Sequence, residues 1–120
     1  IKEIADIIEH INILVFGMGG AMSMAQRRGL DNNHLNELLA SGAVSEAFGY
    51  YFDKEGNIVH EISTIGIKLS TFKSLEKIIG VAGGEEKAEA IISISRLNPN
   101  LVLICDERVA KKIIFKFKEE

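Results

Sequence analysis

Residues 75–117 alternate twice between a short apolar run and an amphipathic stretch, and this alternation constrains the fold more than any other feature. The segments, which begin at Leu75, are "LEKIIGVAGG", "EEKAEAIISISRL", "LVLICDE" and "RVAKKIIFKF", in that order. Runs of β-branched residues followed by segments of helical period predict strand, helix, strand, helix. A βαβ unit of this kind needs parallel strands, and continuously apolar strands are typical of a parallel sheet covered on both faces. The sequence therefore predicts an α/β fold with a mostly parallel, Rossmann-like sheet covered by helices.

The first third of the chain predicts further helices around one buried strand. Residues 1–9 carry isoleucines at helical spacing, and residues 11–16 ("INILVF") form an apolar run that ends in glycine. The stretch "SMAQRRGLD" favours a short helix or an ordered loop. Asp31 or Asn32 is the expected cap of a following helix that ends near Ser41.

The middle of the chain predicts a β-hairpin excursion from the sheet. Aromatic and β-branched residues flank "DKEG", which suits a hairpin in which Gly56 supplies the positive φ. After it, Ile65, Ile67 and Leu69 alternate with other residues, which indicates another extended piece.

Composition excludes several classes of protein. The chain has 120 residues, 47% of them hydrophobic and 26% charged, which is typical of one globular domain, and its net charge of −3 gives no general attraction to DNA or anionic membrane. No apolar run is long enough to cross a membrane. Cys105 is alone, so no internal disulfide is expected and a reducing, cytoplasmic setting fits. His10, His34 and His60 have no ligand spacing, so we predict no metal and no cofactor.

Three loops follow predicted strands, where ligands collect in open α/β sheets. They are "FGMGGA", "AGGEEK" and "CDER". The first lacks the spacing of a dinucleotide fingerprint, so a tight turn with close packing is the better interpretation. The second is no Walker loop, because its lysine comes too soon and no Ser or Thr follows it. It does place Lys87 at a helix start, where an anion can bind, although a solvated surface lysine is the main alternative.

Two further segments contain candidate binding residues. Arg27 and Arg28 precede a predicted helix, where planar guanidinium groups can hold a phosphate, although surface arginines are common there. Glu46 lies in a small, apolar run, so its carboxylate must be paired, bound to a ligand, or on the exposed face of a strand. The simplest interpretation is that Glu46 lies on the exposed face of a strand.

Four segments, "MAQRR", "AVSEAFGYYFDKEGNIVH", "VAGGEEKAEAI" and "LICDE", together resemble the effector-binding domain of the SorC (deoxyribonucleoside-regulator-like) family of bacterial transcriptional regulators. The similarity runs from about residue 11 to residue 112, and it is strongest to the branch that regulates central glycolytic genes. It implies a Rossmann-like fold related to sugar-phosphate isomerases and deaminases, used for sensing. Residues 1–120 would form the C-terminal portion of the sensor, and the DNA-binding helix-turn-helix domain is absent from this chain.

The resemblance also implies a ligand and three contacts. In the glycolytic branch the effector is fructose 1,6-bisphosphate, and the matching positions are Arg27 and Lys87 for phosphate and Glu46 for sugar hydroxyls. Many sugar-responsive members have Gly-Asp at Ser45-Glu46, so the glutamate favours the glycolytic branch. The usual threonine before Asp-Glu is Cys105 here, a departure that touches none of these contacts.

Two hypotheses of different classes follow. In the first, the chain is a repressor's sensing module: a phosphorylated sugar changes how the protein, as a homodimer or homotetramer, assembles on operator DNA through another domain. In the second, it is an isomerase or deaminase on the same fold. That chemistry needs a poised acid and base. Glu46 and Asp106 are the available carboxylates, and the sequence marks neither as perturbed, so the expected answer is a non-enzymatic module.

Overall fold

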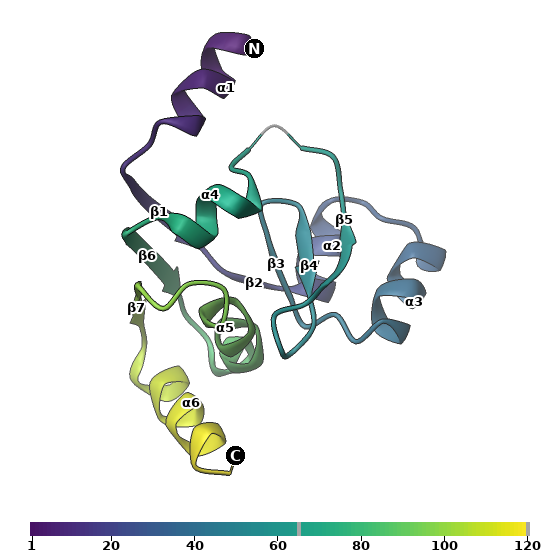
Figure 1. The fold of residues 1–120 in the computed structure, drawn as a ribbon. Coiled ribbons are helices and arrows are strands. Elements are labelled where there is room, and N and C mark those ends of the chain that lie inside the picture. The colour runs from purple at the N-terminus through teal and green to yellow at the C-terminus, as the bar shows by residue number, and fades with distance from the viewer. Residues whose placement is uncertain (65, 120) are drawn as a thin grey trace.

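The computed structural model describes residues 1–64 and 66–119, with side chains as far as residue 118. Its helices and strands follow one another in an α/β order (Figure 1). They are α1 (Lys2–Glu9), β1 (Ile13–Gly17), β2 (Gly19–Gly20), α2 (Ala21–Arg27), α3 (Asn32–Ala40), β3 (Ser45–Ala47), β4 (Tyr50–Phe52), β5 (Ile58–Glu61), α4 (Leu69–Ser74), β6 (Lys77–Ala82), the 3-10 turn η1 (Glu85–Lys87), α5 (Ala88–Ser95), β7 (Leu101–Cys105) and α6 (Glu107–Glu119).

A three-stranded parallel sheet in the order β1-β6-β7 forms the frame of the molecule. In its register Phe16 lies beside Gly80, and Gly80 lies beside Leu103. The strand, helix, strand, helix prediction for the last third is confirmed as β6, α5, β7 and α6. The predicted α/β class, with a parallel sheet flanked by helices, is likewise confirmed.

A second, antiparallel sheet has the order β2-β3-β4-β5. The predicted hairpin joins β4 to β5, and Gly56 has the expected positive φ of 87°. A second hairpin joins β3 to β4 through Phe48 and Gly49, whose φ angles are 58° and 88°. This turn was not predicted, because a two-residue turn with both φ angles positive normally uses Asn or Gly at its first position, and Phe48 occupies it here.

The hydrophobic core lies where α5 packs between the two sheets (Figure 1). Six of the eight residues of α5 are buried. The buried hydroxyls of Ser45 in β3 and Ser93 in α5 are hydrogen-bonded at 2.9 Å, and Ser93 donates to the Asp53 carbonyl at 2.6 Å. These bonds satisfy polar groups that would otherwise weaken the contact between helix and sheet.

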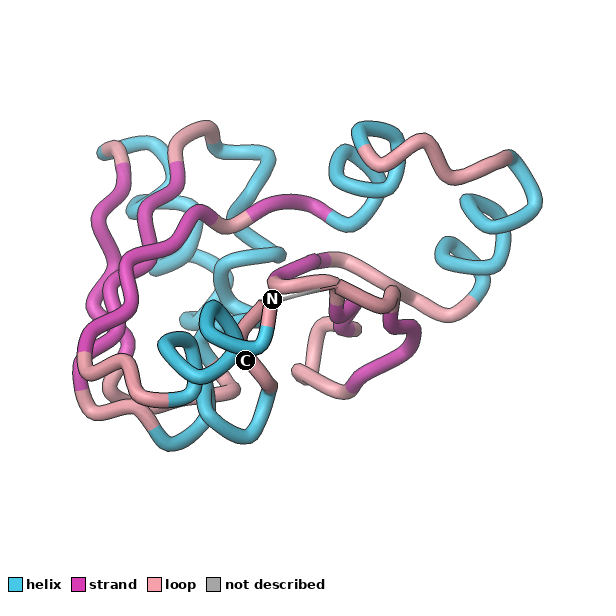
Figure 2. The backbone as a smooth tube through the Cα atoms, turned by 90° about the horizontal axis from the view of Figure 1, so that it is seen from above, coloured by secondary structure: helices cyan, strands magenta, loops and turns pink. Residues whose placement is uncertain are grey.

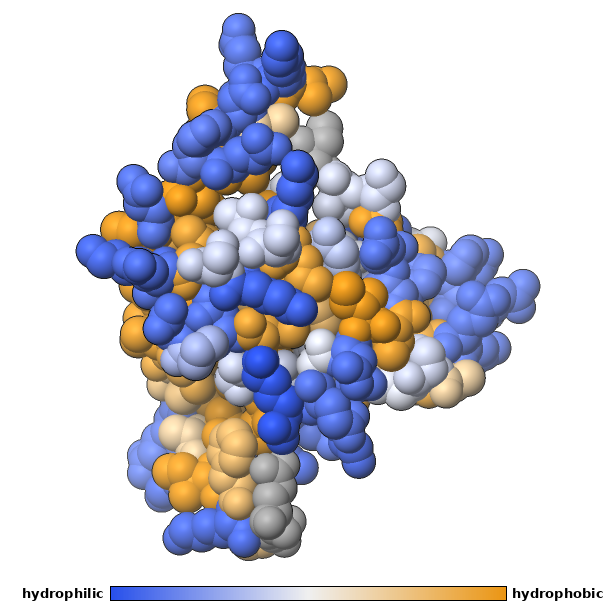
Figure 3. All heavy atoms as spheres, in the orientation of Figure 1, coloured by the Kyte–Doolittle hydropathy of each residue, from blue (hydrophilic) through white to orange (hydrophobic). Residues whose placement is uncertain are grey.

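One face of the parallel sheet is exposed and apolar. Viewed from above, the helices lie on the other side of the three strands (Figure 2). The exposed apolar side chains on these strands are 43% to 62% accessible, and they are those of Ile13, Val15, Val81, Val102 and Ile104. Hydrophobic surface follows this edge of the molecule and continues on α6 (Figure 3). A sheet face of this kind is typical of a surface that packs against further polypeptide.

Two local predictions have different outcomes. The expected extended piece is wrong at Leu69, which begins helix α4; Ile65 lies outside the described residues. This short helix depends on tertiary contacts: Phe72 is buried, and the Asn98 side chain donates to the Phe72 carbonyl at 2.8 Å. Asp31 caps α3 as predicted, because its Oδ1 accepts from the His34 backbone N–H at 2.9 Å.

Candidate functional site

The carboxylate of Glu46 is buried in the middle of the antiparallel sheet. Glu46 is 3% exposed and lies in β3 between Gly19 of β2 and Tyr51 of β4. The simplest interpretation from the sequence, that Glu46 lies on the exposed face of a strand, is therefore wrong. A buried carboxylate needs partners, because removing its charge from water without compensation is costly.

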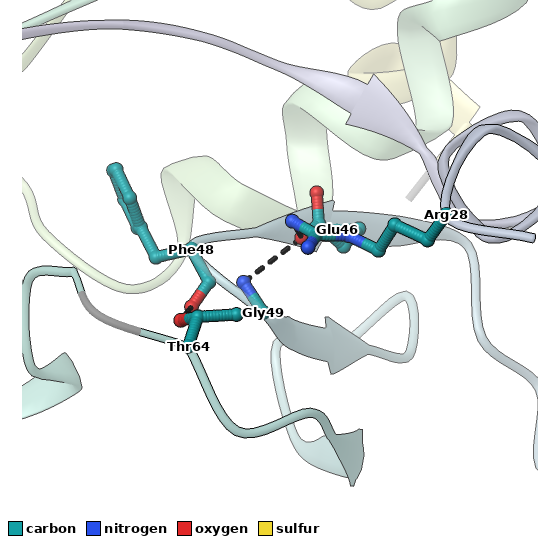
Figure 4. Close-up of polar contacts among 5 residues, drawn as sticks. All are labelled: Arg28, Glu46, Phe48, Gly49 and Thr64. Carbon is teal, nitrogen blue, oxygen red and sulfur yellow. Dashed lines mark hydrogen bonds and ion pairs between the residues drawn. The ribbon is translucent and has the colours of Figure 1, made fainter.

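Both partners of Glu46 bind the same oxygen. Arg28 donates from Nη2 to Oε1 at 2.7 Å, and the backbone N–H of Gly49 donates to Oε1 at 2.9 Å. The Arg28 side chain extends to Glu46 from the end of α2, and the Gly49 N–H comes from the turn after β3 (Figure 4). Within the described part of the chain, no donor reaches Oε2. The carboxylate is thus held through one oxygen while the other keeps its lone pairs free.

The Gly49 donor is presented by a strained turn. Phe48 has a φ of 58°, a conformation that is unusual for a bulky side chain. Its ring packs 5.4 Å from the rings of Phe16 and Phe72, and its carbonyl accepts from Thr64 Oγ1 at 3.2 Å. An added Cβ at Gly49 would lie 2.8 Å from the Ile62 carbonyl oxygen. Aromatic packing therefore holds a turn that aims an amide at Glu46.

Tyr51, opposite Glu46, has a fully buried ring and hydroxyl. Its hydroxyl has no hydrogen-bond partner among the described residues. Burial raises the pKa of Tyr51, and the negative charge of Glu46 raises it further. The phenol is therefore a neutral donor close to a carboxylate.

Lys87 lies at the start of α5, after the carboxyl end of β6. It is the last residue of η1, it is half-buried, and it makes no ion pair with any described residue. Gly84 opens this loop with a φ of 96°, and its N–H donates to Asp106 Oδ2 at 2.7 Å. Asp106 also accepts from the Val109 N–H at 2.9 Å, so it caps α6 and ties that helix to the Lys87 loop.

These backbone hydrogen bonds have an electrostatic consequence for Asp106. The N–H of Gly84, followed by that of Val109, lowers the pKa of the Asp106 carboxyl below its ordinary value. The Asp106 carboxylate is therefore charged at neutral pH. In this charged form it accepts the Gly84 N–H and so holds the loop that contains Lys87.

The two neighbouring arginines have different surroundings. Arg27 is the last residue of α2; it is exposed, and it has no ion pair within the described residues. Arg28 is engaged by Glu46 instead. The residue pattern alone makes both arginines candidates for phosphate, and the family resemblance selects Arg27; neither indicates the pairing of Arg28, because Arg28 and Glu46 are 18 positions apart in the sequence.

The structure puts Glu46 and Lys87 beyond the carboxyl ends of neighbouring parallel strands. Glu46 pairs with Gly19, which follows β1, and Lys87 follows β6, the strand hydrogen-bonded to β1. No described hydrogen bond or ion pair joins Arg27, Glu46 and Lys87 to one another, so their convergence on one ligand stays a prediction.

A separate hollow of about 380 Å³ is lined in part by Phe48. It lies between α1, the strands β4 and β5, and α4, and none of the three predicted site residues lines it. The described residues contain no group of three or more metal-ligating side chains placed to hold an ion. Among the described residues, no helix has the length and apolar character needed to cross a bilayer.

Comparison with known proteins identifies the family. Residues 1–115 match the family model described as "Putative sugar-binding domain". The chain belongs to this sugar-binding domain family. The central glycolytic genes regulator of Bacillus subtilis is 41% identical over 114 residues, and that of Priestia megaterium is 39% identical over 117. These matches cover 95% and 98% of this chain, and in both cases 34% of the relative's length.

Solved structures agree with this assignment and with the fold. A SorC family transcriptional regulator from Enterococcus faecalis is 36% identical, with a TM-score of 0.86, over 94% of this chain and 46% of that chain. The full-length sorbitol operon regulator SorC from Klebsiella pneumoniae, 20% identical, shares the fold with a TM-score of 0.77 over 92% of this chain and 38% of that one. The predicted SorC-type resemblance is confirmed, and the chain spans less than half the length of these relatives.

Proposed function

We propose that this chain is the C-terminal portion of the effector-binding domain of a bacterial repressor of glycolytic genes, and that its effector is fructose 1,6-bisphosphate. The observation that carries the proposal is the Glu46 carboxylate, buried to 3% exposure yet held through one oxygen only, in a member of a sugar-binding family. Such a carboxylate is suited to accept hydrogen bonds from sugar hydroxyls.

The phosphate groups would be held by Arg27 and Lys87, neither of which has an ion-pair partner among the described residues. Lys87 stands at the start of α5, where backbone N–H groups and the helix dipole favour an anion, and Arg27 offers a planar guanidinium. The nearby acidic residues Glu85 and Glu86 are exposed and can turn toward water. Each residue type therefore matches the ligand group assigned to it.

Isothermal titration of the intact natural protein with fructose 1,6-bisphosphate, compared with fructose 6-phosphate, tests the proposal. We expect the bisphosphate to bind more tightly. A charge-assisted hydrogen bond contributes about 1.5 to 3 kcal/mol, so Lys87→Ala should weaken binding about ten- to hundredfold. The matched control is Lys73→Ala, an exposed lysine on α4, which should leave affinity unchanged. Equal affinity for the two sugars would contradict the proposal.

The regulatory part of the proposal concerns DNA. We infer that operator DNA is bound by a helix-turn-helix domain outside these residues, that the protein works in the cytoplasm as a homodimer or homotetramer, and that the effector acts by binding one conformational state more tightly. Support comes from the relatives, two of which are named central glycolytic genes regulator and one of which is named a SorC family transcriptional regulator. Fructose 1,6-bisphosphate should change the mobility of the complex with operator DNA, and an unchanged complex would contradict this inference.

The proposal excludes catalysis on sugar phosphates. One oxygen of Glu46 is already occupied by Arg28 and by the Gly49 N–H, whereas isomerase or deaminase chemistry needs an acid and a base placed together at the sugar carbons. We therefore expect no turnover of ribose 5-phosphate or glucosamine 6-phosphate. Measurable, Glu46-dependent turnover of either sugar would favour an isomerase or deaminase instead.

A further inference from the structure

We propose that Arg28 is a positioning residue that turns Glu46 toward the sugar, so that the neighbouring arginines have separate tasks. Arg28 serves recognition of the sugar hydroxyls through Glu46, and Arg27 serves binding of phosphate. This inference rests on the proposed function, and it adds a residue that determines selectivity at the same site.

The first argument is the direction of the carboxylate. Arg28 Nη2 and the Gly49 N–H both bind Oε1, at 2.7 Å and 2.9 Å. Two donors on one oxygen fix the rotation of the carboxylate plane, and the free oxygen Oε2 then points away from both. A ligand hydroxyl that donates to Oε2 meets an acceptor whose orientation is set before binding, which reduces the entropy lost on binding.

The second argument is the geometry of α2. Arg27 ends this helix, and Arg28 follows it with helical φ and ψ of −79° and −4°. Consecutive helical residues leave the axis about 100° apart. When Arg28 reaches Glu46 in β3, Arg27 is directed elsewhere, so the two guanidinium groups do not act on Glu46 together. Their adjacency in sequence therefore does not make them interchangeable.

The third argument is charge. A buried carboxylate beside a bisphosphate would repel it, because like charges in a poorly solvated site interact strongly. The guanidinium of Arg28, 2.7 Å from Oε1, offsets the charge of Glu46. Its side chain is 32% exposed, so it keeps contact with solvent while it binds the buried carboxylate. Because Arg28 offsets this charge, Glu46 can accept hydrogen bonds from the sugar hydroxyls in a site that also binds phosphate.

The test compares two ligands that share their phosphates and differ in their hydroxyls. They are fructose 1,6-bisphosphate and hexane-1,6-diyl bisphosphate, titrated into the intact natural protein that carries these residues. The quantity measured is the ratio of the two affinities. Wild type should prefer the sugar. In Arg28→Ala and in Glu46→Gln this preference should fall about tenfold or more, the worth of a hydrogen bond to a charged group. Arg28→Ala should reduce it no further in a Glu46→Gln background.

Two further variants separate positioning from other roles. Arg27→Ala should weaken both ligands by similar factors and leave the ratio unchanged. Arg28→Lys keeps a cation within reach of Oε1 and should restore part of the preference, so it also serves if Arg28→Ala fails to fold. Far-UV circular dichroism checks the fold of every variant.

The outcomes distinguish this inference from the proposed function. The positioning role is refuted if wild type binds the sugar bisphosphate and the Arg28→Ala and Arg28→Lys variants keep the wild-type ratio of affinities. Equal losses of affinity for both ligands keep this ratio and count as the same result. The proposed function stands in that case. If wild type binds neither bisphosphate, the proposed function fails, and this inference falls with it.

Discussion

Replacing Arg28 by alanine should destabilise the fold even when no ligand is present. The change leaves the Glu46 carboxylate, 3% exposed, with the Gly49 N–H as its one remaining described donor. Removing one partner of a fully buried ion pair costs about 3 to 5 kcal/mol. The Arg28 side chain is 32% exposed, so water can replace part of the lost contact. We therefore expect the free energy of unfolding to fall by about 2 to 3 kcal/mol, below that range.

A double-mutant cycle isolates this interaction. Glu46→Gln keeps the shape of the side chain and removes its charge, so in that background Arg28→Ala should cost only about 0.5 to 1.5 kcal/mol, the net worth of an ordinary hydrogen bond. The difference between the two costs is the coupling energy of the pair. Urea unfolding followed by far-UV circular dichroism is a suitable assay, since the chain contains no tryptophan to report by fluorescence.

Two results would refute this reasoning. The first is a loss of less than about 0.5 kcal/mol in the free energy of unfolding for Arg28→Ala, which is typical of exposed ion pairs that contribute little to stability. An equal cost in the wild-type and Glu46→Gln backgrounds would show that Arg28 stabilises the fold through its packing and not through the Glu46 carboxylate.

Three other substitutions test separate features. Tyr51→Phe removes a buried hydroxyl without a described partner and should leave the unfolding free energy unchanged or raise it by up to about 1 kcal/mol; a clear loss would reveal a hidden partner. Gly49→Ala forces a side chain to a φ of 88° and toward the Ile62 carbonyl, so a loss of about 2 kcal/mol is expected in urea unfolding, and a neutral result would contradict the turn geometry. Asp106→Asn should lower stability at pH 7. Because the folded pKa of Asp106 lies below its unfolded value, the wild-type advantage is present above about pH 4 and is lost as the pH falls through the folded pKa; a difference independent of pH would contradict this.

The regular parts of the fold could be predicted from local pattern. The βαβ unit of the last third has long apolar strands, a periodic helix and a break at Pro99, and all three signals agree. Gly56 marks the β4–β5 hairpin in the same way. In these segments the local preference of the chain and the final structure favour the same conformation.

The features that the sequence did not predict depend on contacts between distant residues. The turn at Phe48 uses a residue with no turn preference, and it is held by the rings of Phe16 and Phe72. Helix α4 has six residues, too few to be stable alone, and it depends on the burial of Phe72 and on hydrogen bonds from Asn98.

The candidate site shows the same limit. Glu46 stands out in the sequence because a carboxylate in an apolar run needs an explanation, and that signal is local. Its partner Arg28 could not be separated from Arg27 by sequence, because the choice depends on how α2 is rotated over β3. The pattern at Lys87 indicates a loop and a helix start, and it does not say which groups face the loop.

The most direct measurement is a crystal structure of the intact protein with fructose 1,6-bisphosphate. We predict phosphate oxygens within about 3 Å of the Arg27 guanidinium and the Lys87 ammonium group, and a sugar hydroxyl donating to Oε2 of Glu46 while Arg28 stays on Oε1. Arg27 and Lys87 directed to opposite sides of the molecule, or the sugar bound in the hollow lined in part by Phe48, would contradict the account.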